Sequence, residues 1–224
     1  MKFNGFPVEF TDFLFSLQFD NSSDLLDQNK IKYKNLIIEP LTLLYNDLVP
    51  VVSNISDSIV VKPSKCISSM YRDMRFSRGT PLKDYMYLRF REPFTDKDVL
   101  GFYFDMGFEH YSCGIRIYKH TSAGMDKIRK YVVENELSFS QELEQLSRLG
   151  MKIYGDDFAK DRHSNINNKF LKELLNKKIF YVGSSHSVSP ITFTDELFIE
   201  LQSTYQKLSG LYLLLKKALY SWHT

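Results

Sequence analysis

One short stretch of the sequence gathers side chains that could bind a negatively charged ligand. Residues 70–85 read MYRDMRFSRGTPLKDY, with three arginines and one lysine among twelve consecutive positions. Arginine recognises carboxylate and phosphate groups through planar, paired hydrogen bonds, so this density predicts an anion-binding pocket. The residues predicted to bind the ligand are Arg72, Arg75, Arg78, Lys83 and Tyr85.

The same stretch could instead hold the fold together. In a strand, alternate side chains point to opposite faces, which places Arg72 on the apolar face and half-buries it. A buried charge is costly unless it is paired, so Arg72 and Asp73, with Arg75, are predicted to form a structural ion-pair network. Arg78 and Lys83 fall on the loop between two predicted strands, where ligand contacts are common. Both interpretations, binding site and structural network, stay open at this point.

A nucleic-acid site is the alternative function. Tyr85, Tyr87, Arg89 and Arg91 alternate with apolar residues, so one strand would carry all four on one face. Exposed aromatic rings that stack on bases, next to arginines that contact phosphates, are typical of proteins that bind single strands. The formal net charge of only +2 weighs against nucleic acid as the partner. A structural or protein-interaction role is the third hypothesis.

Motifs for catalysis or metal binding are scarce. The sequence lacks the nucleophile motif G-x-S-x-G, the phosphate-binding loop G-x-x-x-x-G-K-[ST] and a dinucleotide-binding glycine pattern. His110 and Cys113 lie three positions apart near a predicted turn, but no second pair of ligands accompanies them. The sequence therefore predicts no metal site and no cofactor, and it indicates no catalytic residue. Its motifs leave open whether the protein is an enzyme.

Composition and cysteine content indicate an ordinary globular protein. The 43% hydrophobic and 25% charged residues are typical of such a chain. The first residues contain no apolar run of secretory length, and no window of about 18 residues is apolar and free of charge. The two cysteines, Cys66 and Cys113, are too few to cross-link 224 residues. We therefore expect a cytoplasmic protein with reduced thiols and no membrane contact.

Helical periodicity marks both ends of the chain. Residues 10–17 predict a first helix, and a second follows over residues 26–48. Pro40 is expected to kink or break the second helix, because proline removes a backbone donor and clashes with the preceding turn, and Pro50 is expected to end it. The same period, sustained over residues 195–219, predicts a long C-terminal helix.

Between these helices the apolar period changes to two. Four strands with short connections are predicted, at residues 70–76, 85–91, 99–106 and 112–119. Gly114 opens the last of them, where a glycine permits a bulge or a close backbone approach. Strands in the middle and helices at both ends predict an α+β fold, a central antiparallel sheet of about four strands flanked by helices. No stretch reads as a linker, so residues 1–224 are predicted to form a single domain.

Several segments resemble the "domain of unknown function 2461" family. The resemblance centres on RDMRFSRGTPLK, at residues 72–83, which is similar to a family segment such as YRDTRFSKDKTPYKT. It continues in order through FTDFLFSLQFDNS, NKIKYKNLIIEPL, GFYFDMGFEHYSCGIRIY, MDKIRKYV and LLNKKIF, over nearly the whole chain. The family has no assigned activity. The resemblance therefore implies a fold and a site position, and it does not imply a reaction.

The chain departs from the family pattern at several places. Leu25 and Leu26 stand where the family has an aromatic pair, and Leu82 replaces the tyrosine of its TPYK segment. The glycine-rich entry to the fourth strand is reduced to SCG at residues 112–114, and the Pro-Gly-Tyr element before the later helix is missing. The sequence thus resembles a divergent member of the family.

Overall fold

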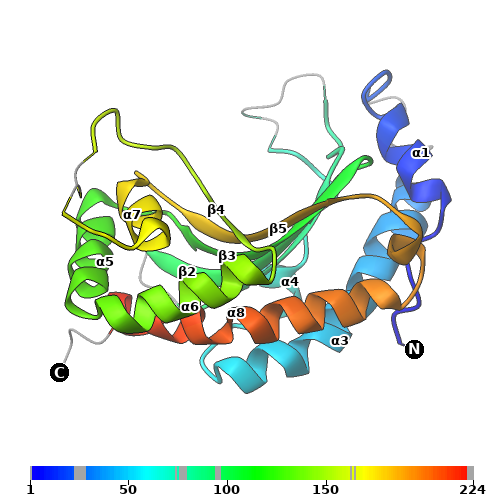
Figure 1. Cartoon of the computed structure of the whole chain (residues 1–224). Helices are drawn as coiled ribbons and strands as arrows, with labels where there is room; N and C mark the ends of the chain where they lie inside the picture. The colour runs from blue at the N-terminus through cyan, green and yellow to red at the C-terminus, as the bar shows by residue number, and fades with distance from the viewer. Residues whose placement is uncertain are drawn as a thin grey trace. The chain divides into compact units, whose positions relative to one another are not determined.

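The computed structural model describes residues 2–22, 29–73, 75, 80–93, 97–161, 163 and 165–220. Over these residues the chain forms helices and one antiparallel sheet of five strands (Figure 1). The α+β class expected from the sequence is confirmed. The long C-terminal helix is confirmed too, as α8 (Glu196–Tyr220).

The sheet begins with the meander that the sequence predicts. Its strands are β1 (Met86–Arg91), β2 (Val99–Met106), β3 (His110–Tyr118), β4 (Lys152–Tyr154) and β5 (Tyr181–Ser187). Their order is β1-β2-β3-β5-β4, so the last strand in the sequence lies between β3 and β4. β4 and β5 are antiparallel, with Tyr154 opposite Tyr181.

The first predicted strand, at residues 70–76, is not part of this sheet. In the described part of that segment, Tyr71 makes an isolated bridge to Leu82, while positions 74 and 76 lie outside the described residues. The side chain of Asn21 accepts a hydrogen bond from the Leu82 N–H and donates one to the Leu82 carbonyl oxygen, both at 2.9 Å. These two bonds tie Leu82, the bridge partner of Tyr71, to the segment that contains Asn21.

The chain divides into two compact units. Unit 1 is Met1–Phe90, Tyr103–Cys113 and Ser185–Ser203, and unit 2 is Arg91–Phe102, Gly114–Ser184 and Thr204–Thr224. Strands β1, β2, β3 and β5 and helix α8 contribute residues to both units. The prediction of a single domain stays a prediction.

Unit 1 buries aromatic and aliphatic side chains of its helices. Its elements include α1 (Glu9–Ser16), a π-helical turn η1 (Lys34–Ile38), α3 (Glu39–Ile55), α4 (Pro63–Cys66) and the 3-10 turn η2 (Pro190–Phe193). Leu14 of α1 and Leu44 of α3 are fully buried. Phe13 meets Tyr33 edge-on, with ring centroids 5.8 Å apart. The helix predicted over residues 10–17 is therefore present, and its apolar face is packed.

The two prolines of the second helical region act differently. The expected irregularity at Pro40 is present, because the π-helical turn η1 ends where α3 begins, and Pro40 is the second residue of α3. Pro50 does not end the helix as expected and lies inside α3. Val51 and Val52 after it are buried, and the burial of these side chains offsets the hydrogen bond that proline removes.

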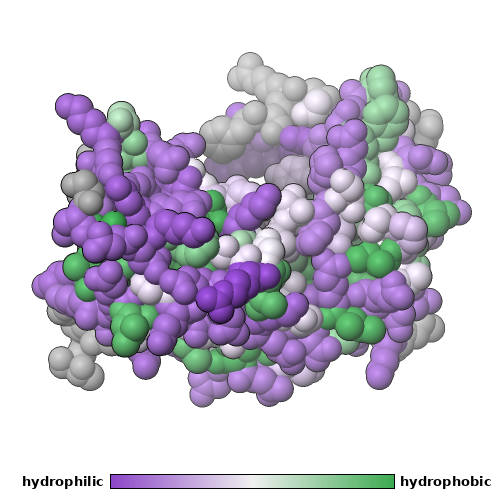
Figure 2. Space-filling view, in the orientation of Figure 1, coloured by the Kyte–Doolittle hydropathy of each residue, from purple (hydrophilic) through white to green (hydrophobic). Residues whose placement is uncertain are grey.

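One helical segment, Asn29–Ile55, is long and apolar enough to cross a membrane by length and composition alone. The core helix of a water-soluble protein passes the same test, and Leu41 and Leu48 of this segment are fully buried in unit 1. The face of the molecule in Figure 2 is mainly hydrophilic, with hydrophobic residues in small separate groups. These features are those of a soluble α+β fold.

Unit 2 joins three helices and the end of α8 to the sheet. The helices are α5 (Ser122–Glu134), α6 (Glu136–Arg148) and α7 (Lys169–Asn176), and α6 contacts both of the others (Figure 1). Phe102 of β2 lies parallel to Tyr212 of α8, with ring centroids 4.4 Å apart. The long helix is thus anchored to the sheet by aromatic side chains, as its apolar face predicts.

Candidate anion-binding site

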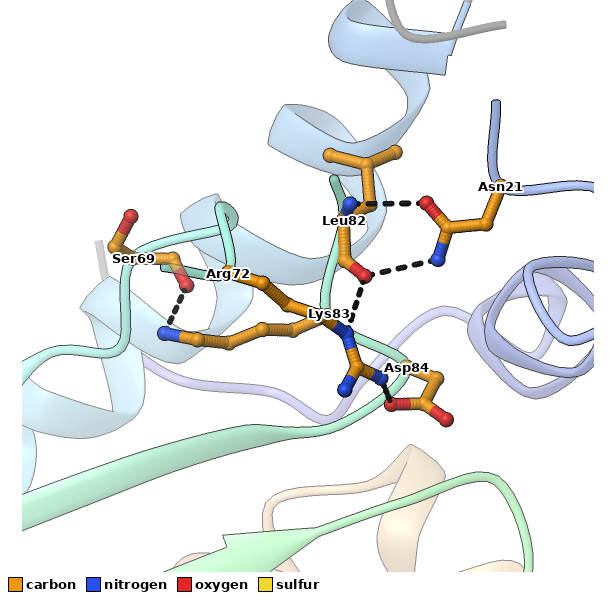
Figure 3. Close-up of polar contacts among 6 residues, drawn as sticks. All are labelled: Asn21, Ser69, Arg72, Leu82, Lys83 and Asp84. Carbon is orange, nitrogen blue, oxygen red and sulfur yellow. Dashed lines mark hydrogen bonds and ion pairs between the residues drawn. The ribbon is translucent and has the colours of Figure 1, made fainter. Parts of the chain in front are cut away.

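Arg72 and Asn21 hold the backbone that follows the predicted loop (Figure 3). The Arg72 Nε–H donates to the carbonyl oxygen of Leu82 at 2.9 Å, and the guanidinium forms an ion pair with Asp84. Asn21 binds the same Leu82 through both its N–H and its carbonyl oxygen. The guanidinium of Arg72 is therefore bonded to groups of the fold, and it fixes residues 82–84 in place.

Arg75 and Asp73 pair with each other at the surface. An Arg75 Nη atom lies 2.6 Å from a carboxylate oxygen of Asp73, and the Arg75 side chain is 81% exposed. Hydrogen bonds from Arg75 hold the pKa of Asp73 below its ordinary value. The network expected among Arg72, Asp73 and Arg75 is thus divided into two pairs, because Arg72 pairs with Asp84. Arg78 lies outside the described residues.

Lys83 is buried instead of standing on an exposed loop. Only 9% of the residue is exposed, and its Nζ donates to the carbonyl oxygen of Ser69 at 2.8 Å (Figure 3). The ammonium lies 5.0 Å from the ring centroid of Tyr87. Burial lowers the pKa of Lys83, and the positive charges of Arg89 and Arg72 lower it further. We call Arg72, Lys83 and Arg89 the cation cluster.

Tyrosine rings lie against the cation cluster. The guanidinium carbon of Arg89 is 3.8 Å from the ring centroid of Tyr87, and that of Arg72 is 5.9 Å from the ring centroid of Tyr85. An Arg89 Nη atom lies 4.0 Å from a carboxylate oxygen of Asp105 on β2. The alternation predicted for residues 85–91 therefore does bring Tyr87 and Arg89 into direct contact, and it leaves Tyr85 39% exposed.

A cleft of about 310 Å³ opens beside Tyr85 and Arg89. The polar side chains that line it are Tyr85, Arg89, Asp105, His110, Ser112 and Ser185. We call it the Arg89 cleft. A guanidinium that faces serine hydroxyls can hold an oxyanion through short, charge-assisted hydrogen bonds. The arrangement suits binding of a phosphate or carboxylate group.

The five residues predicted to bind a ligand have separate positions in the structure. Tyr85 lines the Arg89 cleft, whereas Arg72 and Lys83 are held in the cation cluster by bonds to the fold. Arg75 is at the surface, paired with its neighbour, and Arg78 falls in the part of the chain left undescribed. Of the four that the structure describes, Tyr85 alone lines the cleft.

Sequence reasoning does not identify the rest of the cleft. Arg89 enters it only through the nucleic-acid alternative, and Asp105, Ser112 and Ser185 are not predicted at all. Asp105 and Ser112 carry a usable signal, because both alternate with apolar residues on predicted strands. Ser185 carries none, because its place beside them depends on β5 pairing between β3 and β4.

His110 and Cys113 do not face a common site. Cys113 is fully buried, while His110 is exposed and has its Nδ1 atom 3.5 Å from the hydroxyl of Ser187. Residues three apart in a strand point to opposite faces, which explains the separation. Within the described residues, no three His, Cys, Asp or Glu side chains gather where they could hold a metal ion.

The fold and the cleft define an α+β protein whose polar site lies along neighbouring strands of an antiparallel sheet. The chain belongs to the family described as "Conserved hypothetical protein (DUF2461)", whose sequence profile matches residues 9–213. This match covers nearly the whole chain and confirms the family resemblance of residues 72–83 and the segments around them. No curated protein matches the chain. The family has no assigned function, so function must be argued from the site.

Proposed function

We propose that the protein binds a small ligand with a phosphate or carboxylate group in the Arg89 cleft. The observation that carries the proposal is that Arg89 lines this cleft together with Ser112 and Ser185. Asp84 pairs with Arg72, and Asp105 lies 4.0 Å from Arg89. The positive charges of Arg89 and Arg72 repel Lys83 and lower its pKa beyond the effect of burial. An oxyanion beside Arg89 would relieve this repulsion, since a nearby negative charge stabilises the charged form of each cation.

Each polar group of the cleft has a place in this proposal. The Arg89 guanidinium, held against the Tyr87 ring and near Asp105, donates to an oxygen atom of the ligand. The hydroxyls of Ser112 and Ser185 donate to the remaining oxygen atoms. The half-exposed ring of Tyr85 packs against the organic part of the ligand. Arg72 and Asn21 act indirectly, because they fix the backbone that leads into Tyr85.

A thermal-shift screen with inorganic phosphate, pyrophosphate, phenyl phosphate and benzoate tests this function. A ligand that binds only the folded protein raises the melting temperature, so at least one of these probes is expected to stabilise the wild type. Arg89→Gln removes a charge-assisted hydrogen bond of about 1.5–3 kcal/mol and should weaken binding roughly 10- to 150-fold in calorimetry.

Arg75→Gln is the matched control, because Arg75 is an exposed arginine of the originally predicted site. We expect its affinity for the same probe to stay within about twofold of the wild type, since an exposed pair contributes little. Loss of binding in Arg75→Gln with retention in Arg89→Gln would move the site to the loop at residues 72–83 and contradict the proposal. Failure of all four probes would do the same.

Nucleic acid is the second candidate. Tyr85, Tyr87 and Arg89 follow one another at alternate positions, and Tyr85 is exposed enough to stack on a base. In that case a single-stranded oligonucleotide would bind with an affinity that falls steeply as salt rises. A fluorescence titration at two salt concentrations measures this. Absence of salt-dependent binding removes this candidate.

The cellular compartment is also a proposal. We assign the protein to the cytoplasm on the basis of its thiols. Cys66 and Cys113 are both buried, and neither forms a disulfide within the described residues. Reduced cysteines of this kind are usual in a reducing compartment.

A further inference from the structure

A second group of arginine and tyrosine side chains lies in unit 2. The guanidinium carbon of Arg116, on β3, is 5.1 Å from the ring centroid of Tyr118 and 5.8 Å from that of Tyr181 on β5. The guanidinium carbon of Arg91, on β1, lies 5.7 Å from the ring centroid of the same Tyr118. Tyr181 in turn stacks on Tyr154 of β4, with centroids 5.0 Å apart and planes 9° from parallel. We call these five residues the Arg116 row.

Other arginines of the protein show how the fold itself satisfies a guanidinium. Arg129 of α5 donates to the carbonyl oxygens of Lys177 and Lys178 at 2.7 and 2.9 Å, and it pairs with Asp126 at 2.8 Å. Arg72 is bonded to a carbonyl oxygen and a carboxylate in the same manner. A structural arginine in this protein therefore has acceptors from the backbone and from an acidic side chain.

Arg116 lacks these acceptors. Its Nε atom is buried and makes no hydrogen bond to any residue that the structure describes. Among those residues, no carboxylate lies within ion-pair distance of its guanidinium. A buried donor left without an acceptor is rare in native proteins and calls for a missing partner. The side chain as a whole is nevertheless only half-buried, as are Tyr181 and Tyr154, so a small molecule can reach its Nη end while the Nε atom stays buried.

We propose that Arg116 is the centre of a second ligand site, in unit 2, for an oxyanion attached to a flat ring. The carboxylate or phosphate accepts N–H groups from the two Nη atoms of Arg116 as a paired hydrogen bond. The ring of the ligand packs against Tyr181 and Tyr154, which offer flat, partly exposed surface. All residues of this site belong to unit 2, and those of the Arg89 cleft belong to unit 1.

The side-chain Nε–Hε resonance of Arg116 reports on this site directly. It is assigned by its loss in Arg116→Lys, in a spectrum of protein labelled with ¹⁵N-arginine. Titration with phenyl phosphate and with benzoate should move this resonance to saturation, whereas inorganic phosphate, which has no ring, should bind more weakly. Arg116→Gln is expected to reduce the affinity at least about tenfold. Arg148→Gln, at an arginine 81% exposed on α6, should change it less than about twofold.

Two further variants separate this site from its alternatives. In Arg89→Gln, which leaves unit 2 intact, the probes should still shift the Arg116 resonance. If they do not, the claim that Arg116 forms a separate site is overturned. Arg129→Met should lower the melting temperature by several degrees, whereas Arg116→Met, which keeps the apolar stem, should lower it far less. Equal destabilisation by the two variants, or an Arg116 resonance that no probe moves, would show Arg116 to be a purely structural residue and overturn the proposal.

Discussion

Gly114→Val is expected to lower the free energy of unfolding by about 3 kcal/mol or more, a large effect for one substitution. A Cβ atom at position 114 would lie 2.2 Å from the carbonyl oxygen of Val182 and 2.8 Å from the Cα atom of Gly183. Both are backbone atoms of β5, so neither can rotate away. The close backbone approach predicted for this glycine is present, and the substitution would force β3 and β5 apart.

Urea denaturation of the wild type and of Gly114→Val measures this effect. Gly107→Ala provides the control, since the nearest heavy atom to a Cβ there, the His110 carbonyl oxygen, is 3.9 Å away. Its stability should stay within about 0.5 kcal/mol of the wild type. Equal stabilities for the two variants would mean that β3 and β5 do not approach as closely as described.

Glu92→Ala is expected to cost about 3 kcal/mol of stability. The Glu92 side chain is almost fully buried, and it accepts a hydrogen bond from the Tyr212 hydroxyl at 2.8 Å and pairs with Lys216 at 3.2 Å. Burial raises the pKa of Tyr212 and the negative charge of Glu92 raises it further, so the hydroxyl remains a donor. Removing the carboxylate leaves the buried Tyr212 hydroxyl without this acceptor and Lys216 without this counter-charge.

Two companion variants isolate the cause. Glu92→Gln keeps an acceptor for Tyr212 and should lose less stability than Glu92→Ala. Glu134→Ala breaks an exposed pair with Lys130, whose atoms are 3.8 Å apart, and should change stability by less than about 0.5 kcal/mol. Chemical denaturation of the three proteins under one set of conditions gives the comparison. A Glu92→Ala protein as stable as Glu134→Ala would contradict the account of this anchor between β1 and α8.

Local periodicity was sufficient to predict the first and last helices and three of the five strands of the sheet. The 3.6-residue spacing of residues 10–17 and 195–219 corresponds to α1 and α8, and two-residue alternation locates β1, β2 and β3. Of the strand predicted at residues 70–76, the described residues keep a single bridge, between Tyr71 and Leu82, and Leu82 is also held by Asn21, 61 positions away. No local pattern can reveal a bond over that separation.

The candidate site was harder to predict than the fold. Strand alternation separates half-buried Arg72 from Asp73 and Arg75, as observed, but it does not identify Asp84 as the partner of Arg72 in place of Asp73. The sequence predicts Lys83 on a loop, but the residue is buried and its ammonium donates a hydrogen bond to the Ser69 carbonyl oxygen. The cleft itself combines side chains of β1, β2, β3 and β5. Its composition therefore depends on strand order, which a single sequence does not encode locally.

The central claim is that the Arg89 cleft holds an oxyanion, and a crystal structure grown with selenate tests it most directly. Selenate has the shape and charge of a tetrahedral oxyanion, and its selenium atom is located by anomalous scattering. The account predicts a selenium peak within hydrogen-bond reach of the Arg89 guanidinium and the Ser112 hydroxyl. A cleft without selenium, with peaks confined to exposed arginines such as Arg75, would contradict it.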